Sequence, residues 1–454
     1  MKPTLPQTTK EAKQSAETVR HSHLIERTLN SNKESDYTEQ IEALGKAFEY
    51  EQNAEMYWGE AEFSMLYGTP IYEQATEDQK RALNHLYWVG QYHHTSSAEA
   101  NTMLYNQVTA GVFSTFDNYQ SLCDELELET EQERYHIKAA QRIGLKTKVA
   151  LLGKEALKQS VNSLSNVKSP RQSLPKLGSR PKVGNQEKSL QDSLLRSVSR
   201  TIFSKYHQHY SPFLAEREAN SVPTVTGGLA GYTANPTIFK FLTLNWGSSP
   251  FMACQYYSMR MVANMSLKAY EYQYYKRYKE LNKVGAKTPV PTAFSHYHLL
   301  DEAFHTTMSR VIAQDIYKDF PAPTPYEKLL SNLIVLRGQQ GITGGLSGWL
   351  PATFRHDADY IPSLYRLLRS RLFNLSPADS LHWMEKCLCQ EHEGFYANLN
   401  LHNKLLTAFQ SFFGQLEYLW PVNREMKVMA SSAAISTAIR SNKRAFNKFA
   451  ATVV

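Results

Sequence analysis

The sequence is poor in cysteine and has no long apolar run. Its four cysteines are too few and too scattered along 454 residues for a disulfide framework, and we therefore expect reduced thiols and a cytoplasmic protein. No apolar stretch reaches the length of about 18 residues that a membrane-spanning helix needs. The N-terminus is polar and lacks the apolar core of a secretory signal. We expect no membrane partner.

Acidic residues are slightly fewer than basic ones, 43 against 50, and this imbalance is local. Residues 138–200 carry 14 basic and 3 acidic side chains, so the remainder of the chain is mildly acidic. The basic excess is thus a property of one segment and not of a binding surface. We expect no nucleic-acid partner.

The composition divides the chain into segments. Residues 159–195 are rich in Ser, Pro and Lys and have almost no aromatic side chains, so they cannot bury enough apolar surface to fold. We predict a flexible insert there, between two halves of one helical domain at 51–158 and 196–425. Residues 1–50 are predicted to be a polar, disordered extension, and residues 426–454 a C-terminal helix or tail.

On both sides of the insert, apolar residues recur at spacings of three and four, with few Gly or Pro, as in amphipathic helices. Thr76 stands before an acidic pair as a candidate helix cap. Alternation typical of a strand is confined to short runs such as 222–242. The fold class is therefore mostly α, with helices predicted over roughly 77–115, 125–155, 248–284, 291–320, 325–337, 360–373 and 377–411 and one at the C-terminus.

Four of these helices carry ionisable residues inside an apolar stripe. Positions three and four apart share one face of a helix. Two E-x-x-H helices and two helices with one Glu each are the ligand set of carboxylate-bridged di-iron or di-manganese bundles. The pattern predicts a ferritin-like four-helix bundle core with additional C-terminal helices, and metal ligands at Glu99, Glu133, His136, Glu271, His298, Glu302 and His305.

Each ligand also has a simpler explanation. Glu99 can be an exposed helix residue, and Glu129 and Glu131 compete with Glu133 on the same helix. His305 can be a core histidine with a satisfied ring. Taken together, the order Glu, E-x-x-H, Glu, H-x-x-x-E-x-x-H favours one metal site over four separate coincidences.

At these seven residues the chain resembles the p-aminobenzoate N-oxygenases of the ferritin-like di-iron superfamily. The likeness rests above all on His298, a third histidine four residues before the last glutamate, and it covers about residues 55–320. The insert and the N-terminal extension depart from the family's pattern. The resemblance implies that two iron ions (or manganese), held by the seven residues, react with O2 and oxidise a small organic substrate. N-oxygenation of an (aryl) amine is the reaction that it favours.

The resemblance also implies an external electron donor and a homodimer. Around the ligands, Asp301 is a candidate to accept a hydrogen bond from a ligand histidine of a neighbouring helix, and Tyr135 is a second candidate neighbour of the centre. Arg134 and Arg310 are candidates to bind a substrate carboxylate, because a guanidinium matches its geometry.

Other classes of function remain open. A di-iron C–H hydroxylase or desaturase would use the same ligands. A ferritin-like metal-binding or storage protein would need no organic substrate, and a helical interaction protein would use the histidines only for packing. Storage subunits are compact single bundles. The helices after residue 320, with Trp349, Trp383 and Trp420, indicate a pocket built for a substrate.

Overall fold

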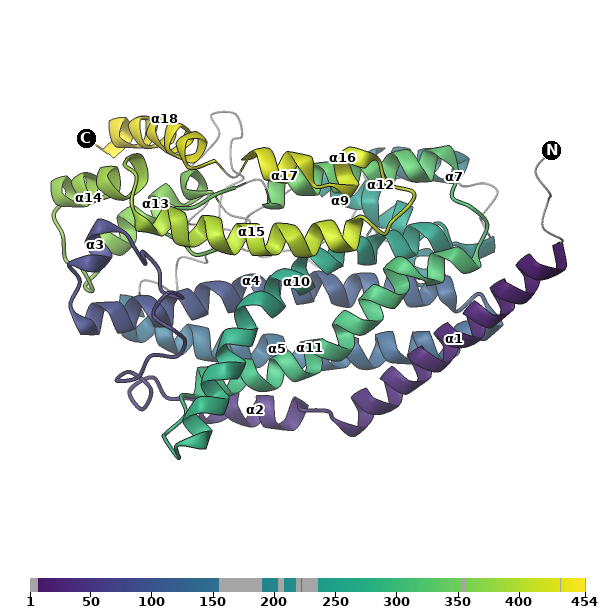
Figure 1. Ribbon diagram of the computed structural model, residues 1–454, viewed down its shortest axis with the longest axis horizontal. Coiled ribbons are helices and arrows are strands. Elements are labelled where there is room, and N and C mark those ends of the chain that lie inside the picture. The colour runs from purple at the N-terminus through teal and green to yellow at the C-terminus, as the bar shows by residue number, and fades with distance from the viewer. Residues whose placement is uncertain are drawn as a thin grey trace.

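Four long helices form the centre of the fold (Figure 1). The computed structural model describes residues 7–154, 190–202, 208–217, 222, 236–343, 345–352, 356–432 and 434–453, and these contain helices and turns but no strand. Helix α4 packs along α5 and α10 along α11, while α10 also contacts α4 and α11 contacts α5. The mostly α fold predicted from the sequence is confirmed. The four helices are α4 (Glu77–Phe113), α5 (Gln120–Leu152), α10 (Pro250–Lys283) and α11 (Val290–Gln314).

Local signals in the sequence set the starts of these helices. The Thr76 hydroxyl accepts a hydrogen bond from the Gln79 backbone N–H, and the Gln79 side chain accepts one from the Thr76 backbone N–H at 3.0 Å, which completes a capping box. Ser249 caps α10 in a similar way, followed by Pro250, whose fixed φ suits a first helical position. The cap predicted at Thr76 is confirmed.

The connections between the long helices are of two kinds. A turn with the short helix η1 (Asp117–Tyr119) joins α4 to α5, and residues 284–289 join α10 to α11. Between the two pairs lie α7 (Leu190–Ile202), α8 (Pro212–Arg217) and α9 (Pro236–Trp246). The predicted flexible insert falls mostly outside the described residues. The run suspected as a strand is helical from residue 236 onward.

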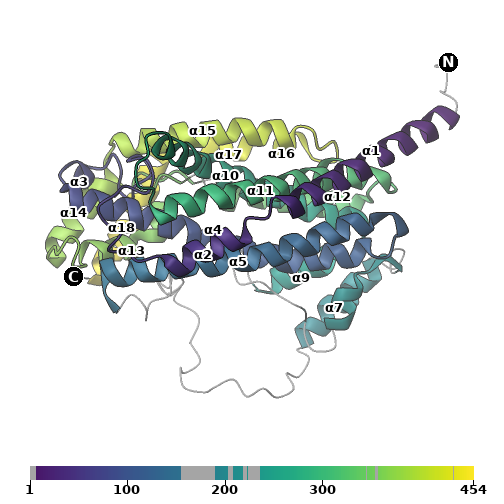
Figure 2. The same cartoon turned by 90° about the horizontal axis from the view of Figure 1, so that it is seen from below.

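The N-terminal region differs from the predicted disordered extension. Residues 7–47 form helices α1 (Gln7–Glu34) and α2 (Thr38–Ala47), and both lie against α5 and α11 (Figure 2). Ile25 and Leu29, four residues apart, are buried on α1, and Ile41 is buried on α2. These few apolar side chains occur at helical spacing within a polar composition, so the average composition concealed an amphipathic pattern.

The C-terminal third of the chain covers one side of the bundle, where α15 lies along α10 (Figure 1). Short helices η4 (Ile316–Asp319) and η5 (Gln339–Thr343) adjoin it. The helices of this C-terminal layer are α12 (Pro325–Gly338), α13 (Asp357–Leu368), α14 (Pro377–Cys389), α15 (Glu393–Phe413), α16 (Pro421–Arg424), α17 (Lys427–Ser432) and α18 (Ile435–Val453). The short helix α3 (Pro70–Glu73) precedes the bundle in the sequence and packs on α14.

One predicted helix, 377–411, is broken in the structure. Helix α14 ends at Cys389 and α15 begins at Glu393. The backbone N–H of Gly394 donates to the carbonyl of Gly68 at 3.0 Å, and a Cβ on Gly394 would collide with the carbonyl oxygen of Gly348. The close approach of the loops at Gly68 and Gly348 to Gly394 therefore sets this break. The local periodicity of apolar residues does not reveal it.

Two apolar clusters fill the bundle on either side of a polar layer. One contains residues such as Val108, Leu126 and Ile312, and the other contains residues such as Trp88 and Phe294. Helices α4, α5 and α11 each contribute to both clusters, and the interval between the two contributions carries buried polar side chains. Because buried charges are costly unless they are paired or bind metal, this layer is the candidate functional region.

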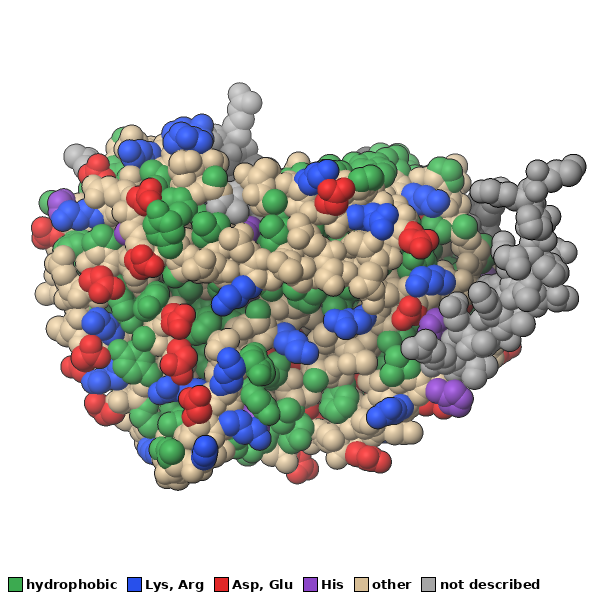
Figure 3. All heavy atoms as spheres, viewed as in Figure 1, with side chains coloured by type: hydrophobic (Ala, Val, Ile, Leu, Met, Phe, Trp, Pro, Cys, Tyr) green, Lys and Arg blue, Asp and Glu red, His purple; other side chains and the backbone are tan. Residues whose placement is uncertain are grey.

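The surface offers no comparable concentration of charge on the face drawn in Figure 3. Acidic and basic side chains are interspersed there. Among the described residues, no helix has the length and apolar character needed to span a membrane.

Candidate metal centre

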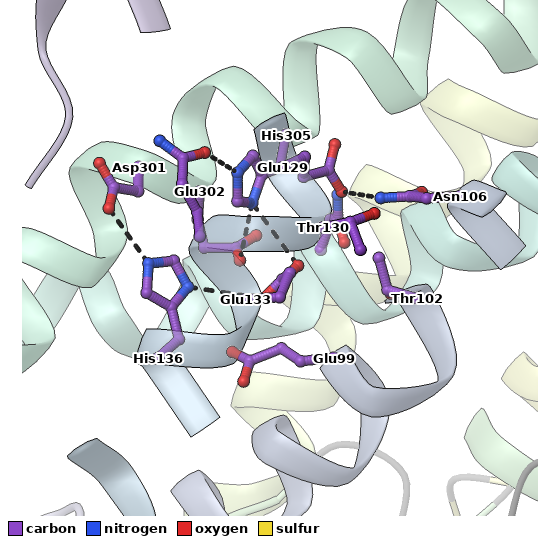
Figure 4. Close-up of polar contacts among 12 residues, drawn as sticks. Glu99, Thr102, Asn106, Glu129, Thr130, Glu133, His136, Asp301, Glu302 and His305 are labelled. Atoms are coloured by element: carbon purple, nitrogen blue, oxygen red, sulfur yellow. Dashed lines mark hydrogen bonds and ion pairs between the residues drawn. The ribbon is translucent and has the colours of Figure 1, made fainter. Parts of the chain in front are cut away.

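The structure brings the seven predicted ligands together in the polar layer, and each of their side chains is at most 5% exposed. They come from all four long helices. Figure 4 shows Glu99 of α4 directed toward Glu133 and His136 of α5 and toward the two ligands of α11 that it labels, Glu302 and His305. The four-helix convergence that the sequence pattern requires is therefore present.

The first half of the cluster is centred on His298. Its Nε2 lies 2.8 Å from Glu99 Oε1, and its Nδ1 lies 2.8 Å from Glu271 Oε1. The hydroxyl of Tyr92 donates to the same oxygen of Glu271 at 2.5 Å. The His136 ring lies 4.5 Å from the His298 ring, centroid to centroid. Potential ligand atoms of Glu99, His136, His298 and Glu302 lie within 4.8 Å of one another.

The second half of the cluster is centred on His305. Its Nδ1 lies 3.1 Å from Glu302 Oε1 and 3.6 Å from Glu133 Oε1. Glu129, one turn before Glu133, is also fully buried, and its carboxylate lies within 4.8 Å of the ligand atoms of Glu133 and His305. From the sequence, Glu129 is expected only as a competitor of Glu133. The four-residue spacing that puts both on one helix face makes it an eighth candidate ligand.

The donor set fits two divalent cations. Two atoms that bind one ion at about 2.1 Å and at right angles lie about 3 Å apart, which is close to the nitrogen–oxygen separations found here. Among the described residues, the second carboxylate oxygens of Glu99, Glu133 and Glu271 have no hydrogen-bond partner although they are buried. Buried oxygens of this kind normally have a partner, and a cation supplies one. Imidazole and carboxylate suit iron and manganese alike.

Two polar side chains contact the outer ring nitrogens of two predicted ligand histidines. Asp301 Oδ2 lies 3.1 Å from His136 Nε2, so the Nδ1 of that ring faces Glu133 at 3.4 Å. Gln132 Oε1 lies 2.9 Å from His305 Nε2 in the same way. A carboxylate or carbonyl on the outer nitrogen fixes the tautomer of a ligand histidine and raises its basicity. The structure thus places Asp301 beside the predicted ligand His136 of α5.

We expect Asp301→Asn to lower the affinity for the metal ion beside His136 about 10- to 100-fold. The neutral amide is a weaker acceptor for the Nε2–H group of His136 than the carboxylate, so it holds the ring orientation less firmly. Metal titration followed by elemental analysis measures the effect. Asp315→Asn, at the C-terminal end of the same helix and partly exposed beside Lys318, is the control. Equal affinities of the two variants would contradict the assigned role of Asp301.

Helix α1 reaches the same network. The side chain of Gln132 donates to Asn32 at 2.9 Å, and Asn32 donates to Glu125 at 2.9 Å. Burial raises the pKa of Glu125 to about 7. Asn32 is fully buried, although it lies in the region predicted to be a disordered extension. Neither Asn32 nor Gln132 belongs to a motif, so sequence reasoning had no signal for them.

A buried guanidinium lies beside the ligands. The Nη2 of Arg260 on α10 forms a close ion pair with Glu129 and lies 3.5 Å from Glu133. Its Nη1 has no hydrogen-bond partner among the described residues. Arg260 also lines a cavity of about 50 Å³ between α4 and α10, together with the ligands Glu99, Glu133 and Glu302. The sequence analysis did not single out this residue.

The other proposed neighbours lie elsewhere. Arg134 is 47% exposed and forms an ion pair with Glu131, and Arg310 is exposed beside a surface groove between α10 and α15. Tyr135 is half-buried under the ammonium of Lys138. None of the three lines the cavity beside the ligands. Their predicted roles stay predictions.

Without metal, the cluster holds protons in place of cations. Burial and the neighbouring His298 oppose a charge on His136, but Asp301 and Glu133 outweigh them and raise its pKa to about 9. Burial likewise opposes a charge on His305, while Glu129, Glu302 and Glu133 raise its pKa to about 10. Both imidazole rings are therefore protonated on both nitrogens, and positively charged, at neutral pH in the metal-free protein.

Metal binding should release these protons, because a metal-bound imidazole nitrogen must be deprotonated. The metal-free form binds more protons than the loaded form at every pH below the raised histidine pKa values. The apparent metal affinity should therefore rise with pH, by up to about tenfold per pH unit for each proton released. Calorimetric titration in buffers of different ionisation enthalpy counts the protons. An affinity that is constant across neutral pH would contradict the protonated cluster.

A helical bundle that buries three histidines and five glutamates at one crossing point has the side chains that a carboxylate-rich metal site needs. The family model described as acyl halogenase, CylC-like, matches residues 20–450, and the chain belongs to this family. The family is one of non-haem di-iron enzymes. No curated protein and no solved structure matches the chain significantly. The match includes the second half of α1, all of α2, the four long helices and nearly all of the C-terminal helices.

Proposed function

We propose that the protein is an O2-dependent di-iron enzyme with a ferritin-like core that oxidises a small organic substrate, and that the oxidation is halogenation of an acyl group. The observation that carries the proposal is the buried convergence of three histidines and five glutamates. Four of these glutamates, Glu99, Glu129, Glu133 and Glu271, have a second carboxylate oxygen with no hydrogen-bond partner among the described residues. The description of the matching family, acyl halogenase, favours halogenation over other O2-dependent oxidations.

The residues of the chain have distinct roles in this proposal. Glu99, His136, His298 and Glu302 would hold one ion, and Glu129, Glu133 and His305 would hold the other, with Glu271 at the second ring nitrogen of His298. Two iron ions bound there would supply the activation of O2. The apolar clusters on both sides keep water from the reacting atoms.

The cavity beside the ligands supports a small anionic co-substrate. Its volume of about 50 Å³ admits O2 or a halide ion but not a whole organic substrate. Arg260 lines the cavity, and its Nη1 has no hydrogen-bond partner among the described residues and can donate. A halide placed there would lie next to Glu133 and Glu302, where the ions would be held. Ala98 and Leu267, both half-buried, line the same cavity between α4 and α10, and we place the approach of the substrate there.

N-oxygenation of an aryl amine is the second candidate. His298, four residues before Glu302, is the feature on which the resemblance to p-aminobenzoate N-oxygenases rests, and the structure places it between Glu99 and Glu271. A third histidine would add electron density to one ion and alter the reactivity of the centre. Neither reaction requires a different ligand set.

A product analysis separates these candidates. The protein is loaded with Fe(II) without oxygen and then exposed to O2 with bromide and either fatty acids and acyl thioesters or p-aminobenzoate. Mass spectrometry detects bromination through the isotope pattern and N-oxygenation through the added oxygen. His298→Ala, loaded in the same way, is the control.

Each outcome has a defined meaning. A brominated acyl product supports halogenation, and an oxygenated amine without bromination supports the second candidate. Slow iron mineral growth without either product would indicate a storage protein. Failure to retain metal after dialysis would overturn the proposal and leave a helical protein with structural histidines.

A further inference from the structure

Oxidisable aromatic side chains connect the buried centre to the surface. Tyr92 on α4 contacts the His298 ring at 5.6 Å between centroids, and Trp88 lies 4.3 Å from Tyr92. Trp58 follows at 5.8 Å from Trp88, and Tyr50 at 6.3 Å from Trp58. The three inner rings are at most 1% exposed, whereas Tyr50 is half-buried. Each ring is in contact with the next.

From this arrangement we propose that Tyr92, Trp88, Trp58 and Tyr50 carry electrons from a reductant at the surface to the metal centre after it has reacted with O2. The route would discharge the oxidised centre when no substrate is bound, and so protect the ligands from oxidation. The inference rests on the proposed O2-dependent function but not on the identity of the substrate. The reductant that fits is a small one-electron donor, such as ascorbate or a thiol, at Tyr50.

The proton partners of the two tyrosines make this exchange feasible. A phenol loses an electron readily only when its proton can leave at the same time. Tyr92 donates its hydroxyl proton to Glu271 in a short hydrogen bond. Tyr50 lies 3.1 Å from His85 Nδ1, and His85 Nε2 lies 2.8 Å from the carbonyl oxygen of Met56. Because a carbonyl can only accept, Nε2 carries the hydrogen and Nδ1 is free to accept from Tyr50.

The state of His85 suits this role. Burial lowers the pKa of His85 to about 4, so the ring is neutral at pH 7 and can take up a proton. The ring also stacks on Trp58 at 4.1 Å between centroids. The two indoles need no proton acceptor of their own, and their N–H groups stay bound to Asn53 O and Ser295 Oγ.

The electron and proton balance closes. Tyr92 gives one electron to the oxidised centre and its proton to Glu271. Trp88 then reduces Tyr92, which recovers the proton, and Trp58 reduces Trp88. Tyr50 reduces Trp58 and passes its proton to His85, and the external donor returns the electron to Tyr50 as His85 returns the proton. The donor is oxidised by one electron, the centre is reduced by one, and the four residues are unchanged.

Aromatic contacts are common in cores, and packing alone explains many of them here. A second branch from Tyr92 runs through Tyr270 to Tyr274 at contacts of 6.1 and 6.3 Å. Tyr274 is fully buried, so that branch has no exposed end. Of these two branches, only the one through Trp88 has a hydrogen-bonded phenol at each end. Tyr92 is hydrogen-bonded to the carboxylate of Glu271, and the half-buried Tyr50 is hydrogen-bonded to the neutral ring of His85. This asymmetry provides a matched control.

The test follows radicals directly. The full chain is loaded with Fe(II), mixed with O2 without substrate, and frozen at successive times for electron paramagnetic resonance. O2 consumption is measured in the same samples. We expect a tyrosyl radical in the wild type and none at this position in Tyr50→Phe. Added ascorbate should shorten the lifetime of the radical. Trp88→Phe and Trp58→Phe keep an aromatic ring but should lose the Tyr50 signal, whereas Tyr274→Phe should retain it.

The outcomes separate the route from the proposed function. If O2 is consumed but Trp88→Phe still forms the Tyr50 radical, or no radical appears at Tyr50 in the wild type, the route is overturned while the oxidase chemistry stands. If no O2 is consumed by the loaded wild type, both proposals fall. Increased oxygen incorporation into peptides of α4 and α10 in Trp88→Phe, seen by mass spectrometry, would support the protective role.

Discussion

The variant His298→Ala should bind no more than one metal ion per chain and should lose more than about 100-fold in O2-dependent turnover, a larger loss than removal of an outer partner of a ligand causes. His298 is the only side chain in the described cluster that lies within 2.8 Å of two ligand carboxylates, Glu99 and Glu271. Its removal separates these carboxylates and leaves them buried without a common partner. Elemental analysis after dialysis against chelator measures the metal content.

A matched control lies on the same helix. His296 is also buried, but its ring stacks on Tyr278 at 3.9 Å between centroids and points away from the cluster. His296→Ala should keep both ions, although it loses packing. Glu271→Ala should behave like His298→Ala. Retention of two ions by both of these ligand variants would remove the basis of the whole site.

The variant Arg260→Met should lower the free energy of unfolding of the metal-free protein by about 3–5 kcal/mol, the range found when one partner of a buried ion pair is removed. The side chain of Arg260 is 3% exposed, and it compensates Glu129 and Glu133 inside the polar layer. Urea denaturation monitored by circular dichroism measures the change. Arg260→Lys should lose less, because it keeps the positive charge.

Two further variants test the explanation. Arg134→Met removes a guanidinium from an exposed pair with Glu131 and should cost no more than about 1 kcal/mol. The double variant Arg260→Met with Glu129→Gln should recover part of the loss, because it removes the unpaired charge as well as its partner. Additive effects of the two substitutions would show that the pair is not the source of the stability.

The spacing of residues along the chain predicted which side chains meet in the polar layer, because these residues occupy long, regular helices. Glu133 and His136, or Glu302 and His305, share a face for a geometric reason that holds in any helix. The fold class followed from the same periodicity. Glu129 lay within reach of this reasoning, since it is one turn from Glu133.

Other features depend on contacts that no local pattern encodes. Arg260 and Asn32 approach the cluster from helices whose rotation is set by packing, so neither stands at a recognisable spacing from a ligand. The break between α14 and α15 follows from the approach of Gly394 to two other loops. The N-terminal helices escaped prediction because a few apolar residues at the right spacing outweigh a polar average.

The hydrogen bonds between Gln132 and Asn32 have a practical consequence for anyone who shortens the chain. A recombinant fragment that starts after α1 would keep all seven predicted ligands. It would lose Asn32, which contacts Gln132 behind the outer nitrogen of His305. Such a fragment would misreport iron affinity and turnover. Protease trimming of the first helix during purification would have the same effect, so intact mass should be checked before any activity is recorded.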